Sequence, residues 1–204
     1  MTVVVPSTAT ASDVDLTPPE EDELLDLARF AVQAATRGEQ ALARDAALER
    51  LGGRPASLRR TGAAFVTLLE RGELRGCIGI LDATRPLAES VAGAAIGAVM
   101  HDWRFRPVAE DELPGIEVQV SVLGPFVRLD DPTAFRLGID GLLVERGFDR
   151  GLLLPEVATE HGFDRMARLQ ATCGKAGLPA DAWRDRATRV SAFCTRRFGG
   201  PALA

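Results

Sequence analysis

The chain has 204 residues, 46% hydrophobic and 26% charged, a mixture typical of an ordinary globular protein that can bury one full-sized core. Its formal net charge of -5 argues against a dedicated nucleic-acid binder, because such binding relies on Lys and Arg to neutralise phosphates, and against electrostatic membrane anchoring. The cysteines Cys77, Cys173 and Cys194 are widely spaced and form no CxxC pair, so we expect no disulfide framework, no structural metal and a cytoplasmic location.

The N-terminal residues 1–16 are small and polar, and we interpret them as a mobile leader. No basic residue precedes their short apolar run, so they do not resemble a secretory signal. The longest apolar stretch, residues 91–100, is too short to span a bilayer. We therefore expect a folded domain over residues 17–200 and no membrane partner.

The first half of this domain predicts helices around one hairpin. A hydroxyl, two prolines and a glutamate form a capping box that begins a helix over residues 17–38, and residues 39–51 can form a second, shorter helix. The apolar runs 63–69 and 74–80 are separated by a short glycine-containing turn, which predicts an antiparallel hairpin. A helix rich in small residues is expected over residues 87–101, able to approach a sheet closely.

The second half predicts mostly strands. Residues 116–123 alternate between apolar and polar, which is the period of a half-covered strand. A strand pair is expected at 139–145 and 151–154, a helix at 163–176, and a last strand at 188–198. Because hairpins dominate and no βαβ unit repeats, the fold class is α+β, with a mainly antiparallel sheet and helices packed on it.

The hairpin strand LRGCIG has the composition of a functional site. Gly76 and Gly79 within one strand indicate a bulge, a bend or the close approach of a ligand. Cys77 lies between them, and strand alternation places the Arg75 guanidinium on the same face, where it would favour a thiolate. The alternative is that Cys77 is a small buried hydrophobic residue, the usual state of a free cysteine.

The order of several motifs resembles the AMMECR domain family over about residues 20–198. The matching segments are GAAFVTL (62–68), LRGCIG (74–79), RPL (85–87), DWRF (102–105), VSVL (120–123), LPEV (154–157) and KAGL (175–178). The resemblance implies an AMMECR-like α+β fold with a larger and a smaller domain. It also implies kinship with proteins of the bacterial AmmeMemoRadiSam system, in which the partners are a Memo-type protein and a radical-SAM protein. The main departure is Glu156, where the family has glutamine.

Other polar residues have two interpretations each. Asp102 and Arg104 follow a helix, so they either fix the hairpin or bind an anion, or they form a simple salt bridge at the helix end. Lys175 is the only lysine among 24 basic residues, which suggests a pocket that requires an ammonium group. His101 and His161 lack metal-ligand spacing and are expected at the surface or in a helix cap, so no cofactor is predicted.

Two functions remain open from these residues. The first is a domain that binds or transforms an unknown small molecule at the LRGCIG hairpin, with Cys77 as the reactive or ligand-contacting thiol and Arg75, Gly76, Gly79, Asp102, Arg104 and Lys175 around the ligand. The second is a non-catalytic subunit that uses the same surface to dock a Memo-type or radical-SAM protein.

Overall fold

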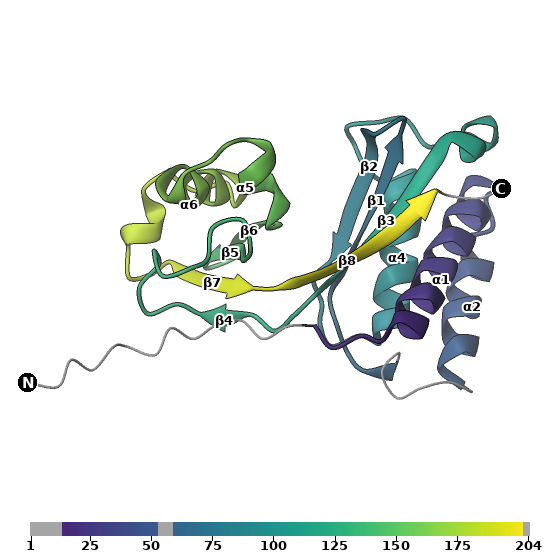
Figure 1. Cartoon of the computed structure of the whole chain (residues 1–204), viewed down its shortest axis with the longest axis horizontal. Helices are drawn as coiled ribbons and strands as arrows, with labels where there is room; N and C mark the ends of the chain where they lie inside the picture. The colour runs from purple at the N-terminus through teal and green to yellow at the C-terminus, as the bar shows by residue number, and fades with distance from the viewer. Residues whose placement is uncertain (1–13, 53–58, 202–204) are drawn as a thin grey trace, which may run out of the picture. The chain divides into compact units, whose positions relative to one another are not determined.

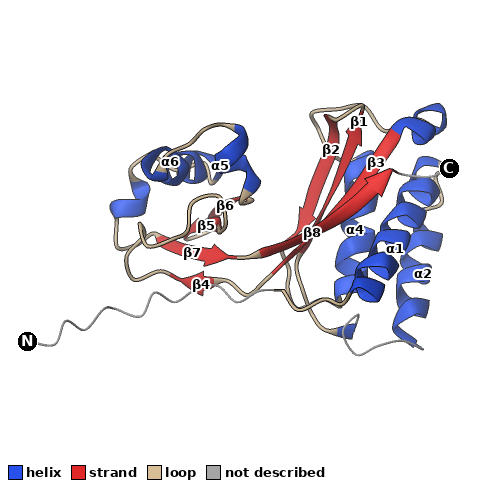
Figure 2. Cartoon of the chain, viewed as in Figure 1, coloured by secondary structure: helices blue, strands red, loops and turns tan. Residues whose placement is uncertain are grey.

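The computed structural model describes residues 14–52 and 59–201, which divide into two compact units (Figure 1). Within these ranges, the N-terminal unit comprises residues 15–123 with 196–201, and the C-terminal unit comprises residues 124–195 with residue 14. Most of the expected leader, residues 1–13, lies outside the described residues. Both units combine helices with antiparallel strand pairs, so the predicted α+β class is confirmed (Figure 2).

The N-terminal unit is a four-stranded sheet with helices on one face (Figure 2). Its elements are α1 (Pro18–Thr36), α2 (Gln40–Gly52), β1 (Ala64–Glu70), β2 (Glu73–Ile80), α4 (Leu87–Met100), the 3-10 helix η1 (Glu110–Gly115), β3 (Ile116–Leu123) and β8 (Thr195–Pro201). The strand order is β2-β1-β3-β8, and β1 pairs antiparallel with both β2 and β3. The predicted capping box is present at α1, where the Glu20 carboxylate accepts the Thr17 N–H at 2.8 Å.

The β1–β2 hairpin is confirmed and turns over two residues. Arg71 has φ 53° and Gly72 has φ 82°, and two consecutive positive values are the signature of the type I′ turn that matches strand twist. The β3 strand is also confirmed, with its isoleucine and valines buried.

A β-bulge in β2 interrupts the hairpin after its first residues. Leu69 pairs with Leu74, but the next residue, Leu68, pairs with Gly76, so Arg75 is left as the extra residue. A bulge changes which residues share a face of the strand. Beyond it, Gly76 lies on the side of α4, and Cys77 therefore lies on the opposite face of the sheet.

Small residues let α4 pack very closely on β2. A Cβ added at Gly76 would lie 2.4 Å from the carbonyl oxygen of Ala98, and one added at Gly97 would lie 2.8 Å from the Ile78 side chain. Both distances are shorter than real Cβ contacts, so glycine is required on each side of this interface. The expected close approach of a small-residue helix to a sheet is thus confirmed.

The C-terminal unit has its own sheet and its own core. Its elements are β4 (Val127–Arg128), β5 (Gly141–Arg146), β6 (Asp149–Leu153), α5 (Glu156–Glu160), α6 (Arg165–Lys175), the 3-10 helix η2 (Ala182–Arg184) and β7 (Arg189–Phe193). The strand order is β4-β7-β5-β6, with antiparallel pairing throughout. Helix α6 contributes the buried Leu169 and Cys173 to a core shared with Leu142 and Val144 of β5.

Two predictions about the strands are wrong. The sequence predicts one last strand at 188–198, but β7 ends at Phe193 and β8 begins at Thr195, and the two belong to different sheets. The single expected sheet is accordingly two. Alternation along the chain reports which face a residue takes, but it carries no information about which partner a strand pairs with. The short β4 and α5 were not predicted, because two to five residues give too little periodicity.

Candidate functional site around Cys77

A polar row crosses the face of the N-terminal sheet that α1, α2 and α4 leave uncovered. Thr67 of β1 is the register partner of Cys77 on β2 and of Gln119 on β3. From β8, Arg197 Nε donates to Gln119 Oε1 at 3.0 Å. One side chain from each of the four strands therefore contributes to a row that ends in a thiol on one edge strand and a guanidinium on the other.

The Cys77 thiol is the partly accessible end of this row. Its side chain is half-buried, and Thr67 Oγ1 donates a hydrogen bond to Cys77 Sγ over 3.2 Å. Two residues further along β2, Gly79 pairs with Phe65, and a Cβ at Gly79 would lie 2.3 Å from the Phe65 ring. The ring therefore covers the glycine, the way aromatic side chains compensate for glycine in strands.

Asp102 and Arg104 hold the backbone of Cys77 from outside the sheet. The Cys77 N–H donates to Asp102 Oδ2 at 2.8 Å, and Arg104 Nη2 donates to the Cys77 carbonyl oxygen at 3.4 Å. The pair is itself bidentate, with Arg104 Nε to Asp102 Oδ1 at 2.8 Å and Nη2 to Oδ2 at 2.6 Å. Because β2 is an edge strand, these two side chains supply the donor and acceptor that a neighbouring strand would otherwise provide.

The electrostatics of this cluster keep both Asp102 and Arg104 charged beside Cys77. The hydrogen bond from Arg104 lowers the pKa of the Asp102 carboxyl to about 2; burial opposes this, and the backbone N–H groups of Cys77 and Arg104 lower it further. The same hydrogen bond from Asp102 raises the pKa of Arg104, and the charges of Asp102 and of the Cys77 sulfur add to the effect. Arg104 is thus a permanent cation next to Cys77.

Arg75 is engaged with groups other than the thiol. Its Nε and Nη2 donate to the two Glu112 carboxylate oxygens at 3.0 and 3.1 Å, and its Nη1 donates to the Arg106 carbonyl oxygen at 3.0 Å. The side chain is only 10% exposed, and its hydrogen bonds lower the pKa of Glu112. The argument that put Arg75 on the same face as Cys77 assumed an unbroken strand, whereas Arg75 is the bulged residue.

The remaining residues named in the sequence analysis lie at different places in the fold. Gly76 faces α4, as described above, and lies beside Cys77 in β2. Lys175 belongs to the C-terminal unit, where it is exposed at the end of α6. His101 is exposed and forms the C-cap of α4, and His161 is exposed with its ring 5.2 Å from that of Phe163. The structure therefore brings Asp102 and Arg104 to Cys77, whereas Arg75 is bonded to Glu112, Gly76 faces α4, and Lys175 is in the other unit.

Sequence reasoning missed Thr67 and Arg197 as members of the site. An unbroken register from the two-residue turn would pair Thr67 with Gly76, and only the bulge moves it opposite Cys77. Arg197 reaches the row because β8 lies next to β3 in the sheet, and the local sequence gives no sign of that neighbour. A third feature is Trp103, between Asp102 and Arg104, whose side chain is 90% exposed.

Across residues 14–52 and 59–201, no three His, Cys, Asp or Glu side chains come together as metal ligands would. None of the helices there has the length and apolar character needed to cross a bilayer.

Comparisons with known sequences, solved structures and family profiles agree with one another. A protein of Methanothermobacter thermautotrophicus is 44% identical over 181 residues, which cover 86% of this chain and 91% of that protein. One of Thermococcus onnurineus is 40% identical over 185 residues, covering 86% and 87%. The crystal structure of protein PH0010 from Pyrococcus horikoshii superposes with a TM-score of 0.75 at 34% identity, covering 89% of this chain and 92% of that one. The AMMECR1 family profile matches residues 25–198, and the chain therefore belongs to the AMMECR1 family.

Proposed function

We propose that this protein binds a small molecule on the uncovered face of its N-terminal sheet and that the Cys77 thiol contacts or attacks that molecule. The observation that carries the proposal is the exposure of the three cysteines. Cys77 is half-buried at the end of the polar row, whereas Cys173 and Cys194 are buried. Burial raises the pKa of Cys173, which makes that thiol less available as a nucleophile.

The surroundings of Cys77 support chemistry at the sulfur. A hydroxyl donor and a guanidinium beside a sulfur both favour its thiolate form, and Thr67 and Arg104 supply these groups. Asp102 bonds to the backbone N–H of Cys77 at the edge of the sheet and so holds the strand in place at the thiol, and Thr67 bonds to the sulfur itself. Gln119 and Arg197 extend the polar surface away from the thiol and would orient a polar ligand.

Alkylation of the native protein with iodoacetamide tests this proposal. The thiolate forms an S–C bond and releases iodide, and peptide mass spectrometry gives the rate at each cysteine. We expect Cys77 to react at least about tenfold faster than Cys173 and Cys194. Equal rates at all three sites, or reaction at Cys77 only after unfolding, would contradict a reactive thiol.

Three variants identify what activates Cys77. Thr67→Val removes the hydroxyl at nearly constant volume, and Arg104→Gln removes the cation, so both should slow alkylation of Cys77 severalfold. Ser121→Ala is the matched control, because Ser121 lies one row away, opposite Phe65, and should leave the rate unchanged. A rate that all three variants change equally would indicate a general loosening of the sheet instead of activation by Thr67 and Arg104.

A second candidate function is supported by Trp103. An indole that is 90% exposed next to a rigid ion pair has the composition of an interaction hot spot, in which Trp and Arg are enriched. Under this proposal the chain is a non-catalytic subunit, and the surface at Trp103 docks the Memo-type or radical-SAM protein that the family resemblance suggests.

Co-purification with those partner proteins separates the two functions. Trp103→Ala should abolish docking while the alkylation rate of Cys77 stays within about twofold. Phe148→Ala is the control, since Phe148 is a fully exposed aromatic residue of the C-terminal unit. Loss of docking in both variants, or in neither, would contradict the role of Trp103.

A further inference from the structure

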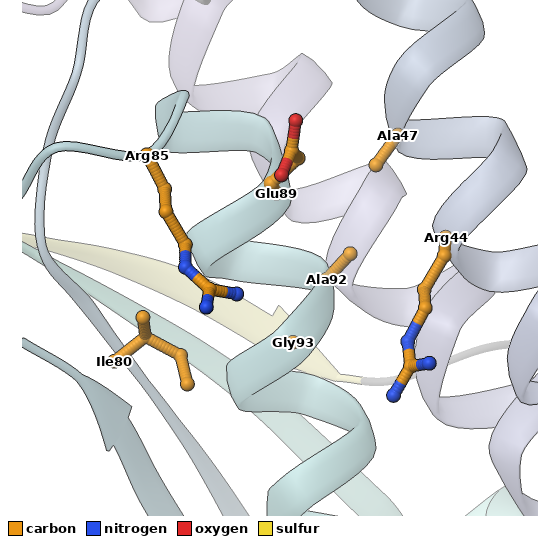
Figure 3. A pocket seen from close by; sticks show the side chains of 7 residues that line it. All are labelled: Arg44, Ala47, Ile80, Arg85, Glu89, Ala92 and Gly93. Atoms are coloured by element: carbon orange, nitrogen blue, oxygen red, sulfur yellow. The ribbon is translucent and has the colours of Figure 1, made fainter. Parts of the chain in front are cut away.

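A hollow in the N-terminal unit lies on the helix side of the sheet, away from Cys77. It has a volume of about 470 Å³ and is lined by Arg44 and Ala47 of α2, Glu89 and Gly93 of α4, Ile80 at the end of β2, and Arg85 (Figure 3). Ile80 contacts α4, whereas Cys77 is on the opposite face of β2. The hollow is therefore a feature separate from the polar row.

Two guanidinium groups reach this hollow from different elements. Figure 3 shows those of Arg44 and Arg85 flanking the part of α4 that carries Gly93. Arg44 has no ion-pair or hydrogen-bond partner among the described residues. Arg85 is bonded through Nε to Asp82 at 3.3 Å, but both side chains are largely exposed, so this bond is weak. The other guanidinium nitrogens remain available, and two guanidiniums around one space fit a dianion.

The rest of the lining favours an organic anion with polar substituents. Glu89 lies one helical turn before Gly93, on the same side of α4, and can accept hydrogen bonds from hydroxyl groups. A Cβ added at Gly93 would meet Ile80 at 3.6 Å, an ordinary contact, so close packing does not require this glycine as it requires Gly97. The missing side chain leaves room in the hollow instead.

We propose that this hollow is a binding site for a small phosphate ester that carries hydroxyl groups. Arg44 and Arg85 bind the phosphate from two sides, which balances its two negative charges. Glu89 accepts hydrogen bonds from the hydroxyl groups, and the ligand packs against Gly93 and Ile80. A volume of about 470 Å³ accommodates a sugar phosphate.

Calorimetric titration with ribose 5-phosphate, inorganic phosphate and ribose tests the site in the full chain. We expect saturable binding of ribose 5-phosphate, weaker binding of inorganic phosphate and no detectable binding of ribose. Arg44→Gln and Arg85→Gln should each weaken ribose 5-phosphate binding about tenfold or more. Arg71→Gln, at the hairpin turn at the other end of β2, removes the same charge and should have no effect.

Glu89→Gln and a carboxylate probe make the assignment specific. Glu89→Gln should reduce the preference for ribose 5-phosphate over inorganic phosphate, because the hydroxyl acceptor becomes a weaker one. Malonate should bind more weakly than phosphate. Equal binding of malonate would overturn the phosphate assignment. Absence of saturable binding, or equal losses in the Arg71, Arg44 and Arg85 variants, would overturn the site itself.

Discussion

Each unit of the chain places a cysteine beside an Asp–Arg ion pair, but the two thiols are in opposite surroundings. In the N-terminal unit, Asp102 bonds to the backbone of Cys77, and the thiol itself remains half-buried at the sheet face. In the C-terminal unit, Arg136 Nη2 donates to the Cys194 sulfur at 3.2 Å and to Asp140 at 2.6 Å, and Cys194 is only 4% exposed.

The comparison shows that an Asp–Arg pair can adjoin a buried thiol as well as a half-buried one. The same three groups anchor the thiol inside one unit and present it at the surface of the other. Both sheets even use the same cross-strand device: Phe193 covers Gly141 as Phe65 covers Gly79, with a Cβ at either glycine 2.3 Å from the ring. The two thiols differ in the exposure of the sulfur and in the atoms that the ion pair contacts, which are backbone atoms at Cys77 and the sulfur at Cys194.

The largest expected difference between the units concerns their buried arginines. Arg75→Met should destabilise the protein by about 3 kcal/mol or more, because it leaves the largely buried Glu112 carboxylate with the Ala109 N–H and, as its cation, only the exposed Arg106, 3.5 Å away. Arg168→Met should cost about 1 kcal/mol or less. Arg168 is fully buried, burial lowers its pKa to about 10, and its Nε and Nη1 have no hydrogen-bond partner among the described residues.

Urea unfolding of the two variants measures both free energies of unfolding. If both variants lost the same free energy of unfolding, the number of paired guanidinium donors would not explain how much each arginine stabilises the protein. Arg168→Met also removes the hydrogen bonds from Nη2 to the Leu153 and Leu154 carbonyl oxygens, at 2.8 and 2.7 Å, and this loss is the reason that we expect a cost of up to about 1 kcal/mol.

An effect of intermediate size on stability is expected when acid protonates Asp102 or when Asp102 is replaced. Its pKa is about 2 in the folded protein and 3.8 as a model value, so ionised Asp102 contributes about 2 kcal/mol above pH 4, and this contribution is lost as the pH falls through 2. Asp102→Asn should lose a similar amount at neutral pH and flatten that acid limb. Stability measured by urea unfolding between pH 2 and 7 checks this.

The corresponding change in the other unit is the control. Asp140→Asn removes a carboxylate that is 4% exposed and bound to Arg136, so it should destabilise the protein without changing the alkylation rate of Cys77. If Asp140→Asn slowed alkylation of Cys77 as much as Arg104→Gln, the proposed activation of the thiol by residues of its own unit would fail.

The smallest expected effect compares one helix glycine from each unit. No heavy atom lies within 4 Å of a Cβ built at Gly174 in α6, so Gly174→Ala should stabilise the protein by about 0.5–1 kcal/mol through helix propensity. Gly97→Ala in α4 should instead destabilise by about 1 kcal/mol, since its Cβ meets Ile78 at 2.8 Å. Thermal unfolding measures the sign of each change, and the same sign in both would contradict the packing argument.

The sequence predicted the elements that have a strong period or a strong boundary signal. The hairpin turn at Arg71, the capped helix at Thr17 and the alternating β3 all have local causes, so the chain alone was enough. The motif LRGCIG likewise located the candidate site at Cys77. The rest depended on pairing: the bulge at Arg75 and the change of sheet at Cys194 follow from long-range contacts that no short window contains.

The bonds of Asp102 and Arg104 to Cys77 have a consequence for how copies of this chain behave in concentrated solution. An edge strand with free N–H and C=O groups is a template on which other chains polymerise into aggregates. In β2 the groups of Cys77 are already occupied by a carboxylate and a guanidinium. We therefore expect the ion pair to disfavour pairing of β2 with a second copy of the chain at this residue, and we expect acid to weaken this effect when it protonates Asp102.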